Sequence, residues 1–171
     1  YMALINYVDE FIVLDDVQFD KRSWQQRNKI KQNNAELLLT IPVNTKGKYD
    51  QKINEVLINY ETNFVEKHLK RIFMSYKKSK YFSQYFNKIE FIFNKKFKKL
   101  SELNINLILF LLKEMSIDTK LSFSSDLDLK EKKHNLINKI CELKKCTTYI
   151  TTKTSEIYLK NLNTTQINYK I

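Results

Sequence analysis

Apolar positions along the chain form two kinds of pattern, continuous runs of strand length and helical stripes. Continuous apolar runs cover 11–14 and 37–43, and shorter strand-like runs cover 56–58, 120–123, 147–151 and 165–169. A strand that is apolar on both faces is typical of a parallel sheet covered by helices. Pro42 marks an edge or exit position in the second run, because proline cannot donate a hydrogen bond to a strand ladder.

Between Phe64 and Tyr76, apolar residues recur every three or four positions, which predicts an amphipathic helix with His68 at the edge of the core. The same spacing recurs in 82–97 and 103–115. A further helix is predicted around 136–141 between two strands, and this order is the signature of a βαβ unit. The chain is therefore predicted to be a single α/β domain over residues 1–171. It should have a largely parallel sheet, flanking helices and a central helical insertion of about three helices, approximately 61–116.

The composition favours a folded protein and excludes several classes. Hydrophobic residues make up 43% of the chain and aromatic residues 13%, which exceeds what a disordered chain carries. Glycine occurs only once, so the visible chain has no P-loop and no dinucleotide fingerprint. The longest apolar run, Leu107 to Leu112, is too short to span a membrane, and no secretory signal pattern is visible. We therefore expect no membrane span and a cytoplasmic location.

The formal net charge of +11 raises the hypothesis of nucleic-acid binding. Lysine, Asn and Ile are abundant while Gly and Pro are scarce, which is typical of AT-rich coding sequence. Because such a bias fills solvent-exposed positions with lysine, the excess charge is weak evidence about partners. Nucleic-acid binding is the weakest of the functional hypotheses.

Functional groups are densest between Asp15 and Asn28, directly after the first predicted strand. In open α/β sheets, ligands bind beyond the carboxyl ends of the strands. Asp15 and Asp16 offer oxygen ligands for Mg²⁺ or for a substrate amino group, although adjacent Asp residues also form turns for local reasons. Ser125 follows the predicted strand 120–123, so it either lines the same crevice or leads into a helix.

The remaining candidates in this stretch suit an anionic or aromatic ligand. The planar guanidinium of Arg27 can bind a phosphate or carboxylate, against the alternative of an ordinary surface cation. Trp24, the only tryptophan, can stack on a base or sugar, whereas tryptophan more often lies in the core. Gln18 and Asn28 carry amides near the strand end that permit hydrogen bonds to a ligand.

These segments resemble a known family. Asp15-Asp16-Val17-Gln18-Phe19, followed by Trp24 and by Arg27-Asn28-Lys29-Ile30, is similar to a pattern of the WbqC-like family, in which an Asp-Asp-Val-Gln-aromatic segment precedes Trp and Arg-Asn-Arg-Ile. The resemblance continues, in the family's order, through 39–43, 51–56, 124–127 and 149–150. Two departures stand out. The family's opening strand and Gln-Pro loop are missing before Tyr1, so we expect a fragment or a truncated frame. In addition, residues 151–155 lack the glycine that the family's loop carries at this place.

The resemblance implies a transferase encoded among bacterial genes for surface polysaccharide such as O-antigen, moving an aminoacyl or acyl group such as glycine. Its partners would be a nucleotide-linked or lipid-linked sugar and an amino-acid or acyl donor, with Mg²⁺ as a candidate cofactor. Asp15 and Asp16 would be catalytic, one of them as a base, and Arg27 and Lys29 would anchor an anionic ligand. The remaining substrate-binding residues would be Gln18, Trp24, Asn28 and Ser125. The alternatives are a non-catalytic family member that acts in assembly or binding, and a basic nucleic-acid-binding protein.

Overall fold

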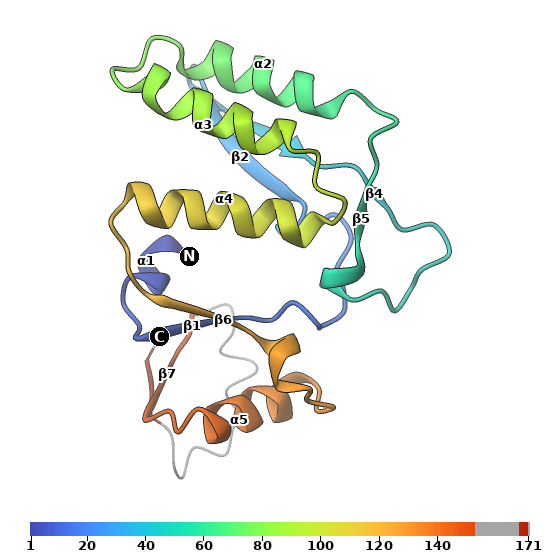
Figure 1. The fold of residues 1–171 in the computed structure, drawn as a ribbon, viewed down its shortest axis with the longest axis vertical. Helices are drawn as coiled ribbons and strands as arrows, with labels where there is room; N and C mark the ends of the chain where they lie inside the picture. Colours follow the sequence, from blue (N-terminus) through green and yellow to red (C-terminus); the bar gives the residue numbers. More distant parts are fainter. Residues whose placement is uncertain (153–167, 171) are drawn as a thin grey trace. The chain divides into compact units, whose positions relative to one another are not determined.

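The computed structural model describes residues 1–152 and 168–170, which contain both helices and strands (Figure 1). The predicted α/β class is confirmed. The chain divides into two compact units: a terminal unit, built from Tyr1–Val17 and the described residues from Leu112 onward, and a central unit, Gln18–Leu111. That these units make one domain stays a prediction. Within the described residues, no helix is both long enough and apolar enough to cross a membrane.

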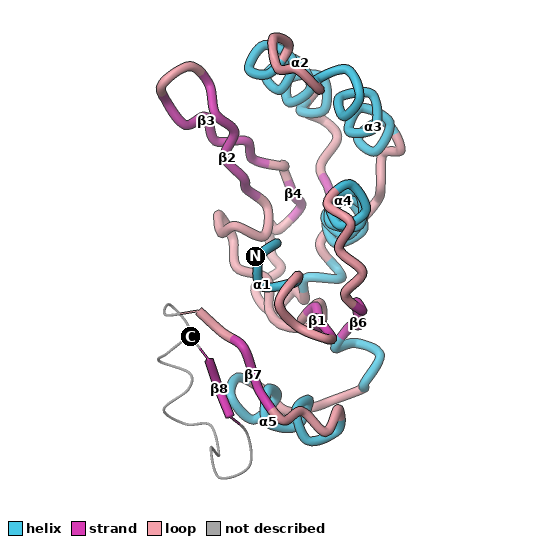
Figure 2. Tube along the Cα trace, turned by 90° about the vertical axis from the view of Figure 1, so that its left-hand side faces the viewer, coloured by secondary structure: helices cyan, strands magenta, loops and turns pink. Residues whose placement is uncertain are grey.

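The terminal unit pairs its strands in parallel. β1 (Glu10–Val13) lies beside β6 (Lys120–Phe123) with Val13 opposite Phe123. β7 (Thr148–Ile150) lies beside β8 (Asn168–Lys170), as Figure 2 shows. The other elements are α1 (Met2–Ile5), the 3-10 helix η2 (Ser124–Leu127) and α5 (Lys133–Leu143). Parallel pairing brings the carboxyl ends of β1 and β6 to the same edge.

The predicted strand–helix–strand order is present as β6, α5 and β7. α5 buries Leu136, Ile140 and Cys141, as its apolar spacing predicts. Within the described residues, β6 pairs with β1 and β7 pairs with β8, so hydrogen bonding does not make β6 and β7 neighbours. The strand predicted at 165–169 is described only from Asn168, and 165–167 lie outside the described residues.

A carboxylate network ties β1 to the end of α5. Lys144 Nζ donates to Glu10 Oε1 at 2.7 Å, Ser122 Oγ also donates to this oxygen, and Lys120 Nζ lies 3.5 Å from it. The hydrogen bonds from Lys144 and Ser122 lower the pKa of Glu10 to about 2. The charged carboxylate therefore belongs to the folded structure.

The strands of the central unit pair in antiparallel fashion. β2 (Arg27–Gln32) and β3 (Ala35–Thr40) form a hairpin, and β4 (Val43–Asn44) pairs with β5 (Leu57–Ile58). The hairpin turn is Asn33-Asn34, with Asn33 at φ 52°, a left-handed conformation that Asn tolerates. The run predicted as one strand over 37–43 is interrupted at Pro42, which lies between β3 and β4. The sequence analysis missed β2 because its six residues include a single strongly apolar side chain, Ile30.

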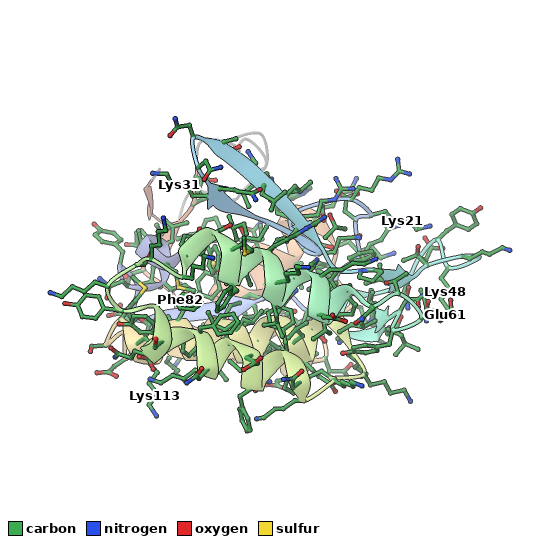
Figure 3. All side chains as sticks on the ribbon, turned by 90° about the horizontal axis from the view of Figure 1, so that it is seen from above. Lys21, Lys31, Lys48, Glu61, Phe82 and Lys113 are labelled. Carbon is green, nitrogen blue, oxygen red and sulfur yellow. The ribbon has the colours of Figure 1, made fainter. Side chains whose placement is uncertain are left out.

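Three helices follow, as the periodicity predicts: α2 (Phe64–Tyr76), α3 (Phe82–Asn94) and α4 (Leu100–Glu114). A 3-10 helix, η1 (Ile53–Glu55), precedes β5. α2 and α3 run side by side, and their aromatic rings meet where Phe82 lies, with Phe73 and Phe82 centroids 5.5 Å apart (Figure 3). The buried core that they share with the strands comprises Phe19, Ile41, Val56, Ile58, Phe64, Leu69, Ile92, Phe93, Leu100 and Leu103.

His68 lies in this core and is only 4% exposed. Its ring makes edge contacts with Phe64 and Phe93, at centroid distances of 5.4 and 6.2 Å. Burial and the nearby charge of Arg71 lower the pKa of His68 to about 4, although a hydrogen bond with the Thr40 backbone acts to raise it. His68 is therefore a neutral structural residue, as its place on the apolar stripe indicates.

Candidate functional site

The parallel strands β1 and β6 of the terminal unit end in an aspartate–serine cluster, made of Asp15, Asp16, Ser124 and Ser125. Asp15 and Asp16 follow β1, and Ser124 and Ser125 open η2 directly after β6. Because the strands are parallel and in register, their carboxyl ends place these side chains together. The predicted placement of Asp15, Asp16 and Ser125 at one strand edge is found in the structure.

Hydrogen bonds organise this cluster around the Asp15 carboxylate. Ser125 donates its backbone N–H to Asp15 Oδ1 at 3.1 Å and its hydroxyl to Oδ2 at 2.8 Å. Ser124 Oγ lies 3.4 Å from Asp15 Oδ1 and donates to Asp16 Oδ1. Because a hydroxyl carries one hydrogen, the shorter contact to Asp16 is the donated bond.

The two aspartates differ in how deeply they are buried. Asp15 is 7% exposed and Ser124 is fully buried, whereas Asp16 is half-buried and Ser125 is exposed. A buried carboxylate is stable only when it is hydrogen-bonded, and Asp15 satisfies this condition. Asp15 therefore fixes the strand ends, and Asp16 is the carboxylate more accessible to a ligand.

No group of three or more His, Cys, Asp and Glu side chains with metal-binding geometry is found in the part of the chain that the structure describes. The cluster supplies two carboxylates and two hydroxyls, which are oxygen ligands of the type that Mg²⁺ accepts. Mg²⁺ binding by Asp15 and Asp16 stays a prediction.

The other predicted site residues belong to the central unit, where 18–26 form a tryptophan loop that leads into β2. Side chains of the loop bind its own backbone. Gln26 is 8% exposed; its Oε1 accepts from Arg22 N at 3.1 Å and its Nε2 donates to Ile41 O at 3.2 Å. Ser23 Oγ donates to Asp20 O at 2.7 Å. These bonds hold the loop in one conformation, including Arg22 at φ 60°.

The loop presents Trp24 to solvent. The indole side chain is 67% exposed, so Trp24 does not lie in the core, where tryptophan usually lies. Lys29 Nζ lies 5.6 Å from the centroid of the Trp24 ring and also pairs with Glu36 on β3. An exposed aromatic face on an ordered loop can stack on a sugar or a base.

Arg27 begins β2, two residues before Lys29, so the two side chains leave the same face of the strand. Its Nε is buried without a hydrogen-bond partner in the described structure, and its guanidinium forms no ion pair there. A buried N–H without an acceptor is rare in folded proteins. Arg27 is therefore the predicted cation best placed to receive an anionic ligand, whereas Lys29 already has a carboxylate partner.

The two predicted amides have local partners. Asn28 Oδ1 accepts from Lys29 N at 2.8 Å, and Gln18 Nε2 donates to Tyr49 O at 3.0 Å. Both side chains are exposed. The contact from Gln18 holds the backbone of a neighbouring loop.

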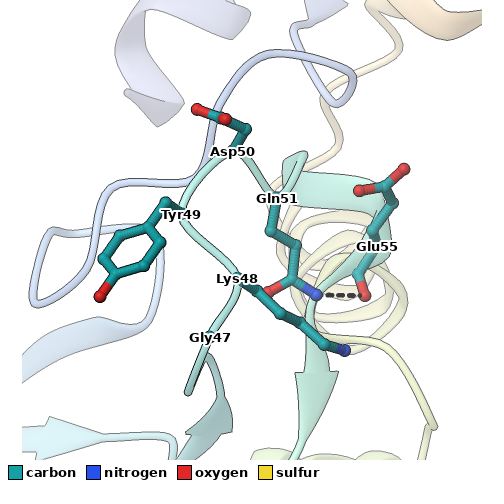
Figure 4. Close-up of a pocket in the computed structure, with 6 residues that line it drawn as sticks. All are labelled: Gly47, Lys48, Tyr49, Asp50, Gln51 and Glu55. Atoms are coloured by element: carbon teal, nitrogen blue, oxygen red, sulfur yellow. Dashed lines mark hydrogen bonds between the residues drawn. The ribbon is translucent and has the colours of Figure 1, made fainter.

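That loop lines a pocket of about 590 Å³, bounded by Gly47, Lys48, Tyr49, Asp50, Gln51 and Glu55 (Figure 4). Gln51 is its buried member at 8% exposure, and its Nε2 donates to Glu55 O at 2.9 Å. Its Oε1 is buried and accepts no hydrogen bond from the described residues.

Sequence reasoning named Ser124 only as part of the segment 124–127 and did not single out Gln26 or Gln51 as site residues. Ser124 satisfies the argument that selected Ser125, because it too follows β6. Gln26 lies within the selected stretch, but only its burial shows that it holds the tryptophan loop. Gln51 lies in the segment 51–56 that resembles the family, but nothing in the sequence shows that its Oε1 is buried without a donor among the described residues, since this arises from tertiary packing.

The predicted residues thus form two groups. Asp15, Asp16 and Ser125 meet in the terminal unit. The central unit brings Trp24 and Lys29 together, places Arg27 on the same strand face as Lys29, and holds Gln18 and Asn28 in local hydrogen bonds.

Comparison with known proteins gives one family. The model of the WbqC-like protein family matches residues 1–170. A Mycobacterium tuberculosis protein, "uncharacterized protein Rv1507c", is 31% identical over 160 residues, which cover 93% of this chain and 69% of that protein. No solved structure matches the chain significantly. The family match therefore extends over both compact units.

Proposed function

Because the chain belongs to the WbqC-like protein family, we propose that it is a transferase that acts on a phosphate-bearing sugar in bacterial surface-polysaccharide synthesis. The sugar would be nucleotide-linked or lipid-linked, and the transferred group an aminoacyl or acyl group such as glycine. The observation that supports this proposal best is the exposed Trp24 ring, held in a hydrogen-bonded loop beside the β2 face that carries Arg27 and Lys29.

Trp24 would supply the stacking surface for the sugar or the base. Leaving an indole exposed forgoes the stability that its burial would bring, and the tryptophan loop nevertheless holds it outward. The loop is ordered before any ligand arrives, which reduces the entropy lost on binding. Lys29, 5.6 Å from the ring centroid, adds positive potential at this surface.

Arg27 would bind the phosphate. Its guanidinium has no ion pair among the described residues, and charge-assisted, bidentate hydrogen bonds are the strongest contacts that a side chain offers to a phosphate.

In the aspartate–serine cluster, we assign the role of base to Asp16. It is more exposed than Asp15, and Ser124 orients its carboxylate. Asp16 would take the proton from the amine or hydroxyl of the acceptor as that atom bonds to the acyl carbon of the donor, and the leaving group of the donor would depart with the electron pair of the broken bond. Asp15 would hold the cluster in place through Ser125.

The proposal is tested by titrating the protein with UDP-glucose, UDP-N-acetylglucosamine and dTDP-glucose in the presence of Mg²⁺, by calorimetry and thermal shift. Arg27→Ala should raise Kd at least tenfold, because a hydrogen bond to a charged group contributes about 1.5–3 kcal/mol. Trp24→Ala should raise Kd about tenfold, since stacking on one base contributes about 1–3 kcal/mol. Asp16→Asn should leave sugar binding intact.

Phe91→Ala and Lys130→Ala are the matched controls, because they remove an exposed aromatic ring and an exposed cation outside the tryptophan loop. Both should bind like the wild type. Equal affinity in Arg27→Ala and wild type would remove Arg27 from the site. Absence of binding to every sugar nucleotide would favour a non-catalytic family member.

A further inference from the structure

The positive charge of the chain is concentrated in one segment. Residues 64–99, which contain α2 and α3, hold eleven of the 30 Lys and Arg residues but only two of the 19 Asp and Glu residues. This segment therefore carries nine of the eleven net positive charges. A codon bias acts along the whole chain, so it does not explain a local excess of this size.

On α2 the cations lie on one face. Lys67, Lys70 and Arg71 lie three and four residues apart, which places them on one side of α2, and Lys77 and Lys78 follow in the turn that ends the helix. All five are exposed, while Phe64, His68 and Leu69 of the helix are buried. We call these five residues the α2 basic stripe.

The stripe lacks neutralising partners. None of its five residues forms an ion pair within the described structure; Lys77 instead lies 5.8 Å from the centroid of the Phe73 ring. Like charges one helical turn apart repel one another and destabilise the helix. An external polyanion would relieve this repulsion.

Apolar side chains interrupt the stripe and flank it. Met74 lies between Arg71 and Lys78 on the same face and is 55% exposed. Phe73 is 42% exposed, and Tyr81, just beyond the helix, is 56% exposed. A helix that combines a row of Lys and Arg with exposed apolar side chains suits the boundary between lipid headgroups and acyl chains.

We propose that the α2 basic stripe binds an anionic lipid surface and holds the protein at a membrane peripherally. Met74 favours lipid over nucleic acid, because an aliphatic thioether can enter the headgroup region but offers no ring for base stacking. The flanking Phe73 ring already contacts Phe82, Phe86 and Lys77, and Lys80 lies over the Tyr81 ring. This inference is independent of the proposed transferase activity, since it uses none of the residues assigned to that site.

The test is flotation of the whole protein with vesicles of phosphatidylcholine alone or with added phosphatidylglycerol, at physiological salt. Wild-type protein should float only with the anionic vesicles. The triple variant Lys67→Gln, Lys70→Gln, Arg71→Gln should bind roughly a hundredfold more weakly, because each cation near an anionic surface contributes about a fivefold gain. Met74→Ser should weaken binding severalfold without a change in charge.

The matched control is Lys46→Gln, Lys48→Gln, Lys130→Gln, which removes the same number of exposed cations outside 64–99. It should float like the wild type. An equal loss of binding in both triple variants would overturn the proposal, because net charge and not the stripe would then control binding. No flotation with anionic vesicles, or binding to single-stranded RNA in preference to them, would also overturn it. Far-ultraviolet circular dichroism checks that both triple variants keep the wild-type helix content.

Discussion

His68 shows how one buried side chain makes stability depend on pH. The folded protein holds its imidazole between Phe64 and Phe93, where burial lowers its pKa to about 4. In the unfolded chain the imidazole returns to a pKa of about 6.5. Between these two values, the unfolded chain binds a proton that the folded protein does not.

We therefore predict that the free energy of unfolding is unaffected by His68 above pH about 6.5 and falls as the pH is lowered towards 4. The slope should be about 1.4 kcal/mol per pH unit, since one pKa unit corresponds to that energy. Urea unfolding at a series of pH values measures it. His68→Gln should flatten the slope, and His134→Gln, which changes a histidine at the start of α5, should keep it. A slope that survives His68→Gln would contradict this account.

Trp24 and Gln51 show that the identity of a residue does not predict whether its side chain is buried. Tryptophan is usually interior, so its identity predicts burial, and only the hydrogen bonds of the tryptophan loop show that the ring is held outward. Gln51 is an ordinary polar residue in a polar loop, yet packing buries its amide and leaves Oε1 without a donor among the described residues.

At the scale of elements, the network around Glu10 joins β1, β6 and α5. The depressed pKa of Glu10 means that its charged form stabilises the fold above the unfolded pKa of about 4.5, and that this contribution is lost as the pH falls towards 2. Lys144, the C-cap residue of α5, supplies the main hydrogen bond.

Glu10→Gln should lower the free energy of unfolding by about 1–2 kcal/mol at neutral pH, because the pair is partly exposed and screened by water. The difference between wild type and variant should shrink between pH 4.5 and 2, as measured by thermal unfolding. Glu142→Gln, which breaks the exposed pair with Lys139 on α5, is the control and should change stability little. A difference that stays constant across this pH range would show that Glu10 acts through packing and not through its charge.

At the scale of the whole molecule, α4 bears on whether the two compact units unfold together. The helix runs continuously from Leu100 to Glu114, while the boundary between the units falls after Leu111. A helix that supplies core residues to both units, Leu103 to one and Leu112 to the other, favours cooperative unfolding.

We predict a single urea transition that shifts to lower urea in both Leu103→Ala and Ile140→Ala. These residues are 2% and 5% exposed in the central and terminal units respectively, and each truncation should cost about 2–5 kcal/mol. Hydrogen exchange would show whether protection is lost in both units at once. Two unfolding transitions, each shifted by only one of the variants, would instead indicate that the chain consists of two domains.

The sequence by itself determined the elements whose signal is local. The apolar spacing of 64–76 gives α2 at its observed bounds, and the apolar run 11–14 and the strand-like run 120–123 give β1 and β6 to within one residue. It also placed Asp15, Asp16 and Ser125 at strand ends. A helical stripe or an apolar run records burial within one segment, so it can be read without knowledge of the neighbours.

Only the tertiary structure decided which segments pair and which side chains remain unpaired. Asp15 and Ser125, which hydrogen-bond to each other, lie 110 residues apart along the chain, and the Arg27 guanidinium forms no ion pair among the described residues. Such pairing depends on long-range contacts and on the entropy of closing the loops between them, neither of which leaves a period in the sequence. The same holds for the α2 basic stripe: its lysines are visible in the sequence, but the absence of carboxylate partners in the described structure is a property of the fold.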